Sequence, residues 1–332
     1  MEIVIFRFDL SEIERALVEA VERGVFVHAL IAFTNRGGEE NLRKLERRFL
    51  ASGITVARTA QDLARYHGKM MIVDRKELCL TAFNFTRADI GRSRSFGLMT
   101  RNSKLVAEAV KLFEADTKRQ AYTAGNAKFL VSPVNAREEL AAFIKGAKRE
   151  LLIYDPKISD KAMLRLLEER KDSGVEIRVI GEISTNKVSA VEMKRLRLHT
   201  RTAVRDRTHV FIGSQSLRQQ ELDTRREIGV IFRDGSAVKN VVRTFEEDWT
   251  ASSSKRWQPS KTSATRATKK LAKTVSDRVP LAPVTRKLVQ SISDSSNGKF
   301  SRKKIRATVK NVMKDVVEKT AQEAVKIAAE GR

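Results

Sequence analysis

The sequence is poor in cysteine and contains no long hydrophobic run. Cys79 is the only cysteine among 332 residues, so an intramolecular disulfide and a cysteine-rich zinc site are excluded. It lies within the apolar residues 78–80, which predicts a buried structural side chain. Charges at Glu2 and Arg7 interrupt the apolar stretch that a secretory signal would need, and no uncharged apolar run is long enough to cross a bilayer. We therefore expect a cytoplasmic protein, with peripheral attachment to a membrane as the alternative.

Acidic residues are scarce relative to basic ones. The chain carries 65 Lys and Arg against 41 Asp and Glu, a formal net charge of +24. This balance favours a polyanionic partner, which can be a nucleic acid, an anionic lipid surface or a phosphate-rich substrate. Residues 251–332 hold 20 basic and 6 acidic residues, a net charge of +14, which leaves +10 for the first 250 residues. The shift predicts a folded region followed by a basic tail.

Strand-like and helix-like patterns alternate through the folded region. Residues 3–6 form a short apolar run, apolar residues then recur at helical spacing from Leu10 to Val21, and residues 25–33 read as another strand. This alternation is typical of an α/β fold in which helices cover a sheet. The apolar content of 41% is sufficient for a core, and the length suggests two domains.

The chain also repeats itself after about 150 residues. The segment EIVIFRFDLSEIERAL, from Glu2, aligns with ELLIYDPKISDKAMLRLL, from Glu150, and both read as strand, loop and helix. We therefore expect duplicated domains at residues 1–122 and 123–250, followed by the tail at 251–332. Only the second copy is preceded by a further strand and helix pattern, so either the two copies differ or the first is truncated at its N-terminus.

The most informative stretches are HGKMMIVDRKELCLTAFN in the first copy and HTRTAVRDRTHVFIGSQS in the second. In a strand, alternate side chains share a face, so a histidine and a basic residue two positions later point to one site. A single histidine beside a strand is more often structural, but matched offsets in both copies favour a functional interpretation. Six positions correspond, namely His67 and His199, Lys69 and Arg201, Asp74 and Asp206, Thr81 and Gly213, Asn84 and Ser216, and Ser95 and Glu227.

This pattern resembles the phospholipase D superfamily, whose signature is H-x-K-x4-D followed after six residues by G-S-x-N. The resemblance covers roughly residues 1–250 and implies two phospholipase D-like α/β-sandwich domains that share one active site. The first copy departs from the signature by having Thr81-Ala82 in place of Gly-Ser. The second has Arg201 in place of Lys and Ser216 in place of Asn.

The resemblance implies a catalytic set that needs neither metal nor cofactor. His67 is expected to attack the phosphorus and form a covalent phosphohistidine, while His199 acts as the general acid and base. Lys69 and Arg201 would balance the charge of the phosphate oxygens. Glu227 occupies a position where family members often carry an acid that orients the histidine, and its carboxylate would favour the imidazolium form that suits the proton donor.

Two further groups of residues follow from the same resemblance. Hydrogen-bond donors to the substrate are expected at Thr81, Asn84, Ser214 and Ser216. Asp74 and Asp206 are expected to hold the turn after each strand rather than to take part in the chemistry.

The same family core handles phospholipids and nucleic acids. Two copies in one chain are typical of phospholipases and of cardiolipin synthase-type phosphatidyltransferases, so we expect a phospholipid substrate. The alternatives are a nuclease of the same superfamily and a weakened protein that binds a phosphodiester without cleaving it.

The basic tail has two parts. Residues 255–310 combine Lys and Arg with Ser, Thr and Pro and are expected to be flexible or partly helical, whereas apolar spacing predicts an amphipathic helix over about residues 302–329. Such a segment could lie on an anionic membrane, follow a nucleic-acid backbone, or dock on the protein or a second copy. The oligomeric state stays open.

Overall fold

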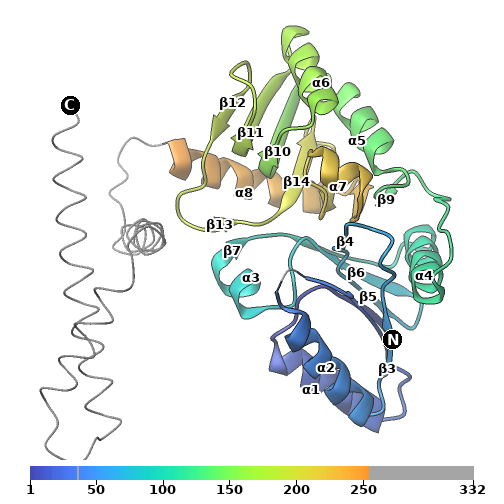
Figure 1. The fold of residues 1–332 in the computed structure, drawn as a ribbon. Coiled ribbons are helices and arrows are strands. Elements are labelled where there is room, and N and C mark those ends of the chain that lie inside the picture. The colour runs from blue at the N-terminus through green and yellow to red at the C-terminus, as the bar shows by residue number, and fades with distance from the viewer. Residues whose placement is uncertain (36, 254–332) are drawn as a thin grey trace, which may run out of the picture. The chain divides into compact units, whose positions relative to one another are not determined.

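The computed structural model describes residues 1–35 and 37–253 (Figure 1). These residues form one compact α/β unit built from two sheet-and-helix halves, which confirms the fold class predicted from the sequence. No helix within this part of the chain is both long and apolar enough to span a membrane. The amphipathic helix predicted near the C-terminus, and the remainder of the basic tail, lie outside the described residues.

The first half contains a six-stranded sheet in the order β3-β2-β1-β5-β6-β8. Strand β1 pairs parallel with β2 and antiparallel with β5. The strands are β1 (Glu2–Ile5), β2 (His28–Ile31), β3 (Thr55–Arg58), β5 (Met70–Val73), β6 (Glu77–Thr81) and β8 (Gly97–Thr100).

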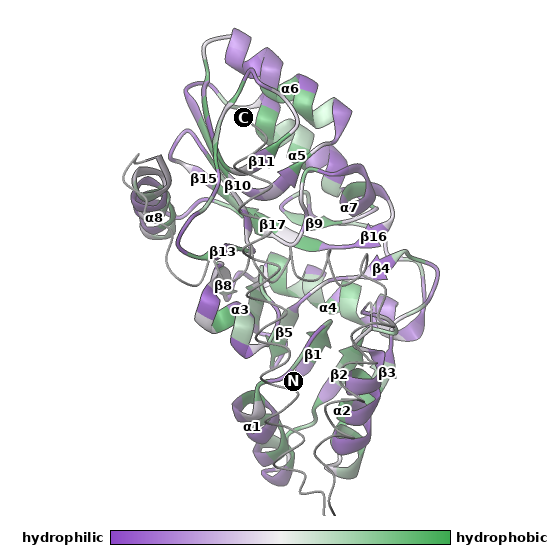
Figure 2. Ribbon diagram, turned by 60° about the vertical axis from the view of Figure 1, so that its left-hand side comes forward, coloured by the Kyte–Doolittle hydropathy of each residue, from purple (hydrophilic) through white to green (hydrophobic). Residues whose placement is uncertain are grey.

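Helices cover both faces of this sheet because its strands are apolar on both sides. Ile3 and Ile5 pack with α1 (Ser11–Glu22) and α2 (Glu39–Ala51), whereas Val4 belongs to the cluster that contains α4 (Ser103–Lys118). This alternation follows from the two-residue period of a strand. Each of these helices carries hydrophobic residues toward the sheet and hydrophilic residues elsewhere (Figure 2).

The second half repeats this plan with a seven-stranded sheet in the order β12-β11-β10-β14-β15-β17-β9. Its strands are β9 (Phe129–Val131), β10 (Glu150–Ile158), β11 (Glu176–Ile183), β12 (Ser189–Val191), β14 (Arg201–Arg205), β15 (His209–Gly213) and β17 (Ile228–Phe232). One apolar cluster joins α5 (Ala136–Lys145), α6 (Lys161–Asp172) and α7 (Gln219–Asp223), and α8 (Gly235–Ser253) packs on the other face.

The halves differ at one sheet edge. Strand β9 closes the second sheet beyond β17, whereas no strand within the described residues pairs with the corresponding edge of β8. The additional strand and helix of the second copy, which the sequence predicted, are therefore β9 and α5.

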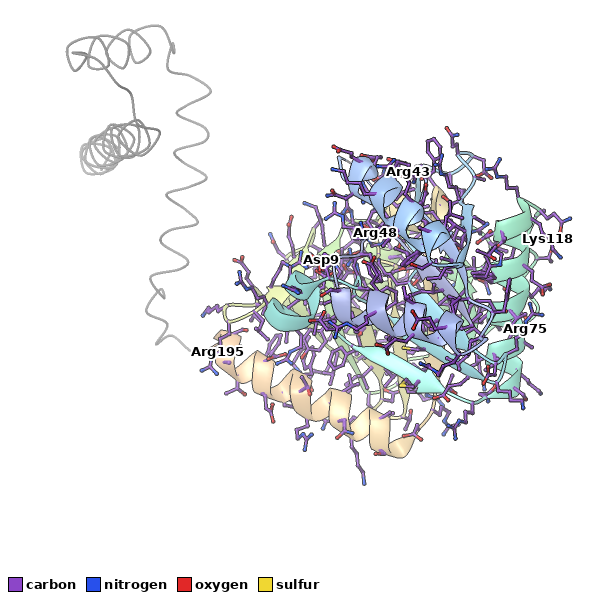
Figure 3. The ribbon with its side chains drawn as sticks, turned by 90° about the horizontal axis from the view of Figure 1, so that it is seen from below. Asp9, Arg43, Arg48, Arg75, Lys118 and Arg195 are labelled. Carbon is purple, nitrogen blue, oxygen red and sulfur yellow. The ribbon has the colours of Figure 1, made fainter. Side chains whose placement is uncertain are left out.

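Charged side chains cover the outer surface of the first half. Figure 3 shows Arg43 and Arg48 on α2, and Lys118 at the end of α4. Arg48 joins the two neighbouring helices through Glu14 of α1, with Nε 2.6 Å from Oε1. Such exposed pairs add little stability, so the apolar faces beneath them carry most of the packing energy.

Two short parallel ladders cross between the halves. Strand β4 (Arg65–Tyr66) pairs with β16 (Arg225–Arg226), and β13 (Arg197–Leu198) pairs with β7 (Ser93–Arg94) beside the short helix α3 (Arg87–Arg92). In each ladder, the two residues directly before a motif histidine pair with a strand of the other half: Arg65–Tyr66 precede His67, and Arg197–Leu198 precede His199. The ladders therefore fix both histidine segments at the same boundary.

A buried polar network reinforces the first of these ladders. The Tyr66 hydroxyl donates to Asp116 Oδ2 at 2.7 Å, and Arg226 Nη2 donates to Asp116 Oδ1 at 3.0 Å. Arg226 also donates to the carbonyl of Ser132 at 3.2 Å. Asp116 therefore joins α4 of the first half to β16 of the second.

We expect Asp116→Ala to lower the free energy of unfolding by about 3–5 kcal/mol, because it leaves the buried Arg226 guanidinium without its carboxylate. Urea denaturation measures this value. The matched control is Glu114→Ala, on the same helix, whose partners Arg75 and Lys118 are exposed, so its loss should stay below about 1 kcal/mol. Equal losses for the two variants would contradict a structural role for the network.

Candidate active site

Each histidine of the repeated motif is anchored to the opposite half of the protein. The backbone N–H of His67 donates to the carbonyl of Arg226 at 2.7 Å, and the N–H of His199 donates to the carbonyl of Arg94 at 3.2 Å. His67 is only 7% exposed. The acceptors directly precede Glu227 and Ser95, the last corresponding pair of the motif.

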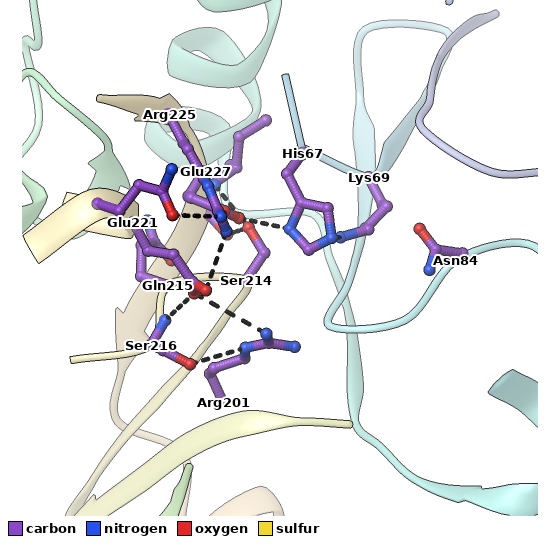
Figure 4. A network of polar contacts seen from close by, with 12 residues as sticks. His67, Lys69, Asn84, Arg201, Ser214, Gln215, Ser216, Glu221, Arg225 and Glu227 are labelled. Carbon is purple, nitrogen blue, oxygen red and sulfur yellow. Dashed lines mark hydrogen bonds and ion pairs between the residues drawn. The ribbon is translucent and has the colours of Figure 1, made fainter. Parts of the chain in front are cut away.

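The side chain of His67 is held at both ring nitrogens (Figure 4). Its Nδ1 lies 2.7 Å from Glu227 Oε2, and its Nε2 lies 2.8 Å from Lys69 Nζ. An ammonium group can only donate, so Nε2 accepts and the ring proton is on Nδ1, which donates to Glu227. The lone pair of Nε2 is therefore the one turned toward Lys69.

This arrangement corrects one expectation from the sequence. Glu227 was expected to orient the proton donor, His199, but its carboxylate contacts the histidine of the other copy, His67. The reason is the crossing of β4 and β16, which places the residue after Arg226 beside the first histidine.

The second histidine has different neighbours. Its Nδ1 is buried and makes no hydrogen bond, and the Oγ of Ser95, which corresponds to Glu227, is likewise buried without a hydrogen-bond partner. Its Nε2 lies 3.6 Å from Asp89 Oδ2. The two histidines therefore occupy corresponding positions with different acids beside them.

Lys69 is among the most deeply buried cations of the described residues, at 1% exposure. Burial is the main cause that lowers its pKa, to about 7, while Glu227 acts in the opposite direction. Its ammonium lies 5.6 Å from the centroid of the Phe6 ring. Lys69 is thus poised to change its charge near neutral pH.

Arg201 lies against its own half. Its Nη1 donates to the carbonyl of His199 at 2.7 Å, its Nε donates to Ser216 Oγ at 3.2 Å, and its Nη2 is 3.8 Å from Glu221 Oε2. Figure 4 shows Arg201 and Ser216 together on the side of the site opposite Asn84.

Burial lowers the pKa of both histidines, and the charges of Lys69 and Arg201 add to this effect. The pKa of His67 falls well below its usual value, and that of His199 falls to about 3, with Asp89 acting in the opposite direction. Both imidazoles are therefore neutral in the free site at neutral pH.

Three residues expected to donate hydrogen bonds to the substrate, Thr81, Ser214 and Asn84, differ in whether they have partners within the protein. The hydroxyl of Thr81 donates to the carbonyl of Phe83 at 2.7 Å, and that of Ser214 accepts the Ile228 N–H at 3.0 Å. Both hydroxyls are thus engaged within the protein, whereas Asn84 Oδ1 is buried without a partner.

Asp74 and Asp206 lie in the two hairpin turns. Their φ angles of 51° and 52° are left-handed, a conformation that Asp tolerates. The Asp206 carboxylate also accepts the backbone N–H groups of Lys148, Arg149 and Glu150.

One pair of acids at the site was not among the residues predicted from the sequence. Asp89 Oδ2 accepts the N–H of Asn84 at 2.8 Å, and Glu221 Oε2 accepts the N–H of Ser216 at 2.8 Å. Both acids are nearly fully buried. A signal was available, because each acid lies 22 residues after the histidine of its own copy.

Within residues 1–35 and 37–253, no group of three or more His, Cys, Asp or Glu side chains is arranged to hold a metal ion.

A family model described as "Cardiolipin synthase, PLD-like domain" matches residues 1–117 and 140–249. No curated protein matches the chain.

Several solved structures are similar. A polyphosphate kinase from Porphyromonas gingivalis is 21% identical with a TM-score of 0.61, over 80% of this chain and 49% of that chain. This chain thus spans about half the length of that kinase. The phosphatidylserine synthase of Haemophilus influenzae Rd KW20 is 9% identical with a TM-score of 0.53, over 83% and 88%. Nuc from Salmonella typhimurium, a phospholipase D family member, is 15% identical with a TM-score of 0.34, over 37% and 93%. At these identities the likenesses to the polyphosphate kinase and the phosphatidylserine synthase show the fold alone.

We expect the site to bind sulfate more weakly as the pH rises above about 7, because Lys69 then loses the proton that attracts an anion. If only the ammonium form binds, the affinity falls by up to about tenfold for each pH unit. Isothermal titration calorimetry with sulfate, which stays a dianion throughout, measures this slope. Lys69→Met should weaken binding and flatten the slope above neutral pH, and a wild-type affinity that is constant there would contradict the prediction.

Proposed function

This chain belongs to the phospholipase D superfamily, as a member of the family of cardiolipin synthase PLD-like domains, and we propose that it is a phosphodiesterase or phosphatidyltransferase that acts on phospholipids. The observation that supports the proposal best is the arrangement of His67 between Glu227 and Lys69. In this arrangement the ring proton is on Nδ1, which faces the Glu227 carboxylate, and the lone pair is on Nε2. A nucleophilic imidazole requires such a tautomer.

In the first step, His67 Nε2 attacks the phosphorus of the phosphodiester. The bond from phosphorus to the leaving oxygen breaks, a phosphohistidine forms, and His199 transfers its proton to the departing alkoxide. Lys69 and Arg201 stabilise the charge that develops on the non-bridging oxygens. Lys69 must first leave Nε2 of His67, and the arriving phosphate oxygen offers its ammonium a new acceptor.

In the second step, water or an alcohol attacks the phosphohistidine. His199, now neutral, takes the proton from the incoming hydroxyl, whose oxygen displaces His67 from phosphorus. Water would give phosphatidic acid from a phospholipid, and an alcohol would give a new phosphodiester. General acid and base assistance of this kind contributes about 10²–10⁴-fold to the rate.

The acid form of His199 depends on the substrate. In the free site its pKa is lowered to about 3, chiefly by burial and then by the two neighbouring cations. A bound phosphodiester anion would offset the charge of Lys69 and Arg201 and so raise this pKa toward its usual range. We therefore infer that proton uptake accompanies substrate binding.

The lipid substrate class rests on the family description, which names cardiolipin synthase. The net charge of +24 suits an anionic lipid surface and a nucleic acid equally. An assay with both substrates therefore decides between a phospholipid and a nucleic acid.

We expect metal-independent phosphatidyl transfer. Purified protein is incubated in EDTA with phosphatidylglycerol vesicles and a little ethanol, and phosphatidic acid and phosphatidylethanol are quantified. Product should form in wild type and fall at least about 10³-fold in His67→Asn, which removes the nucleophile. The matched control is His28→Asn, in β2 beside Phe113 and outside the site, which should retain activity.

Loss of all wild-type activity in EDTA would contradict the mechanism. EDTA-resistant cleavage of DNA, with no lipid product, would overturn the lipid assignment in favour of a nuclease. If both substrates bind but neither is cleaved, the protein is a phosphodiester-binding protein.

A further inference from the structure

The two halves place their histidines alike but surround them with different acids. The carbonyl of Arg226, in the second half, accepts the N–H of His67, and the carboxylate of the next residue, Glu227, contacts the His67 ring. The carbonyl of Arg94, in the first half, accepts the N–H of His199, and the next residue is Ser95, which has no charge. The second histidine therefore lacks a carboxylate at the position from which the first one receives it.

A different residue brings a carboxylate to His199. Asp89, in α3 of the first half, is 4% exposed and has its Oδ2 3.6 Å from His199 Nε2. The N–H and the side-chain amide of Asn84 both donate to this carboxylate, at 2.8 and 2.7 Å, and Arg197 pairs with its other oxygen. These bonds fix the carboxylate beside the histidine in its charged form.

The corresponding acid of the second half behaves differently. Glu221 receives the N–H of Ser216 and the guanidinium of Arg225, at 2.8 and 3.0 Å. Among the described residues, neither histidine forms a hydrogen bond or an ion pair with it. Of the matched pair Asp89 and Glu221, only Asp89 therefore lies within ion-pair distance of a histidine.

We propose that Asp89 is a positioning residue for the general acid, His199. The Asp89 carboxylate keeps a proton on the His199 ring, because the position that corresponds to Glu227 is Ser95 and supplies no carboxylate. The inference rests on the proposed function in one respect only, namely that His199 is the proton donor. The contact between Asp89 and His199 stands independently of the substrate.

The charges that face His199 make this carboxylate necessary. Lys69, Arg201 and Arg197 all disfavour the imidazolium, and burial acts in the same direction. Asp89 is the anion that opposes them. When a phosphodiester offsets the cations, the Asp89 carboxylate still favours the protonated ring, so the proton is present when the bond from phosphorus to the leaving oxygen breaks.

The proton balance follows directly. His199 carries two ring protons before the first step, gives one to the leaving oxygen, and recovers one from water or alcohol in the second. Asp89 stays ionised throughout and exchanges no proton. Its contribution is electrostatic and is largest when the ring is charged.

The test follows the titration of His199 by NMR in full-length protein saturated with sulfate, which stands in for the substrate phosphate. In Asp89→Asn, the His199 midpoint should fall by about 1–3 pH units, as expected from the loss of an adjacent opposite charge. The matched control is Glu221→Gln, the corresponding acid of the second half, which should shift the midpoint less. Equal midpoints in wild type and Asp89→Asn, or equal shifts in both variants, would overturn the proposal.

A second variant guards against loss of folding, because Asp89 also binds Asn84 and Arg197. Adding Ser95→Glu to Asp89→Asn should restore the midpoint to at least the wild-type level, since it supplies a carboxylate at the position that corresponds to Glu227. If the folded double variant keeps a midpoint below that of wild type, restoration has failed and the proposal is overturned.

The rate measurement separates this inference from the proposed function. With phosphatidylglycerol vesicles, the high-pH limb of the rate profile should move to lower pH in Asp89→Asn, and activity should recover in part as the pH is lowered. A shifted NMR midpoint without any lipid turnover would leave the role of Asp89 intact and refute the lipid substrate. Normal lipid turnover in Asp89→Asn, with the high-pH limb at its wild-type position, would refute the role of Asp89 and leave the lipid substrate intact.

Discussion

The site depends on two backbone hydrogen bonds that cross between the halves, from His67 to Arg226 and from His199 to Arg94. Each histidine is therefore positioned in part by the half to which it does not belong. The same crossing sets Glu227 next to His67. Assembly of the site therefore requires both halves, and the buried Asp116 network stabilises the boundary on which it depends.

Electrostatic imbalance is built into the free site. Two cations, Lys69 and Arg201, lie close to two histidines in a largely buried place. Burial and these two charges disfavour protonation of both histidines, and burial and Arg201 disfavour protonation of Lys69. Carboxylates offset part of this cost, but Asp89 and Glu221 are also engaged with backbone N–H groups and arginines. An anion is the missing charge, and a phosphodiester would supply it while setting the protonation states that catalysis needs.

The two histidines of the duplicated motif do not have equivalent surroundings. The first histidine has a carboxylate at Nδ1 and a lone pair at Nε2, which suits attack. The second has an orphan Nδ1 and a carboxylate near Nε2, which suits a proton that is held and then released. The crossing carries each of the two corresponding positions to the histidine of the other half. Because one position is Glu227 and the other is Ser95, only His67 receives a carboxylate in this way.

The sequence by itself determined the α/β fold class, the duplicated pattern and the residues most worth testing, because strand periodicity and repeated offsets are local properties of the chain. It also contains the second pair of matched acids, Asp89 and Glu221, 22 residues after each histidine. Which acid serves which histidine was decided only by the tertiary structure. The parallel pairing of β4 with β16 and of β13 with β7 joins segments more than 100 residues apart, and no local pattern records which of them meet.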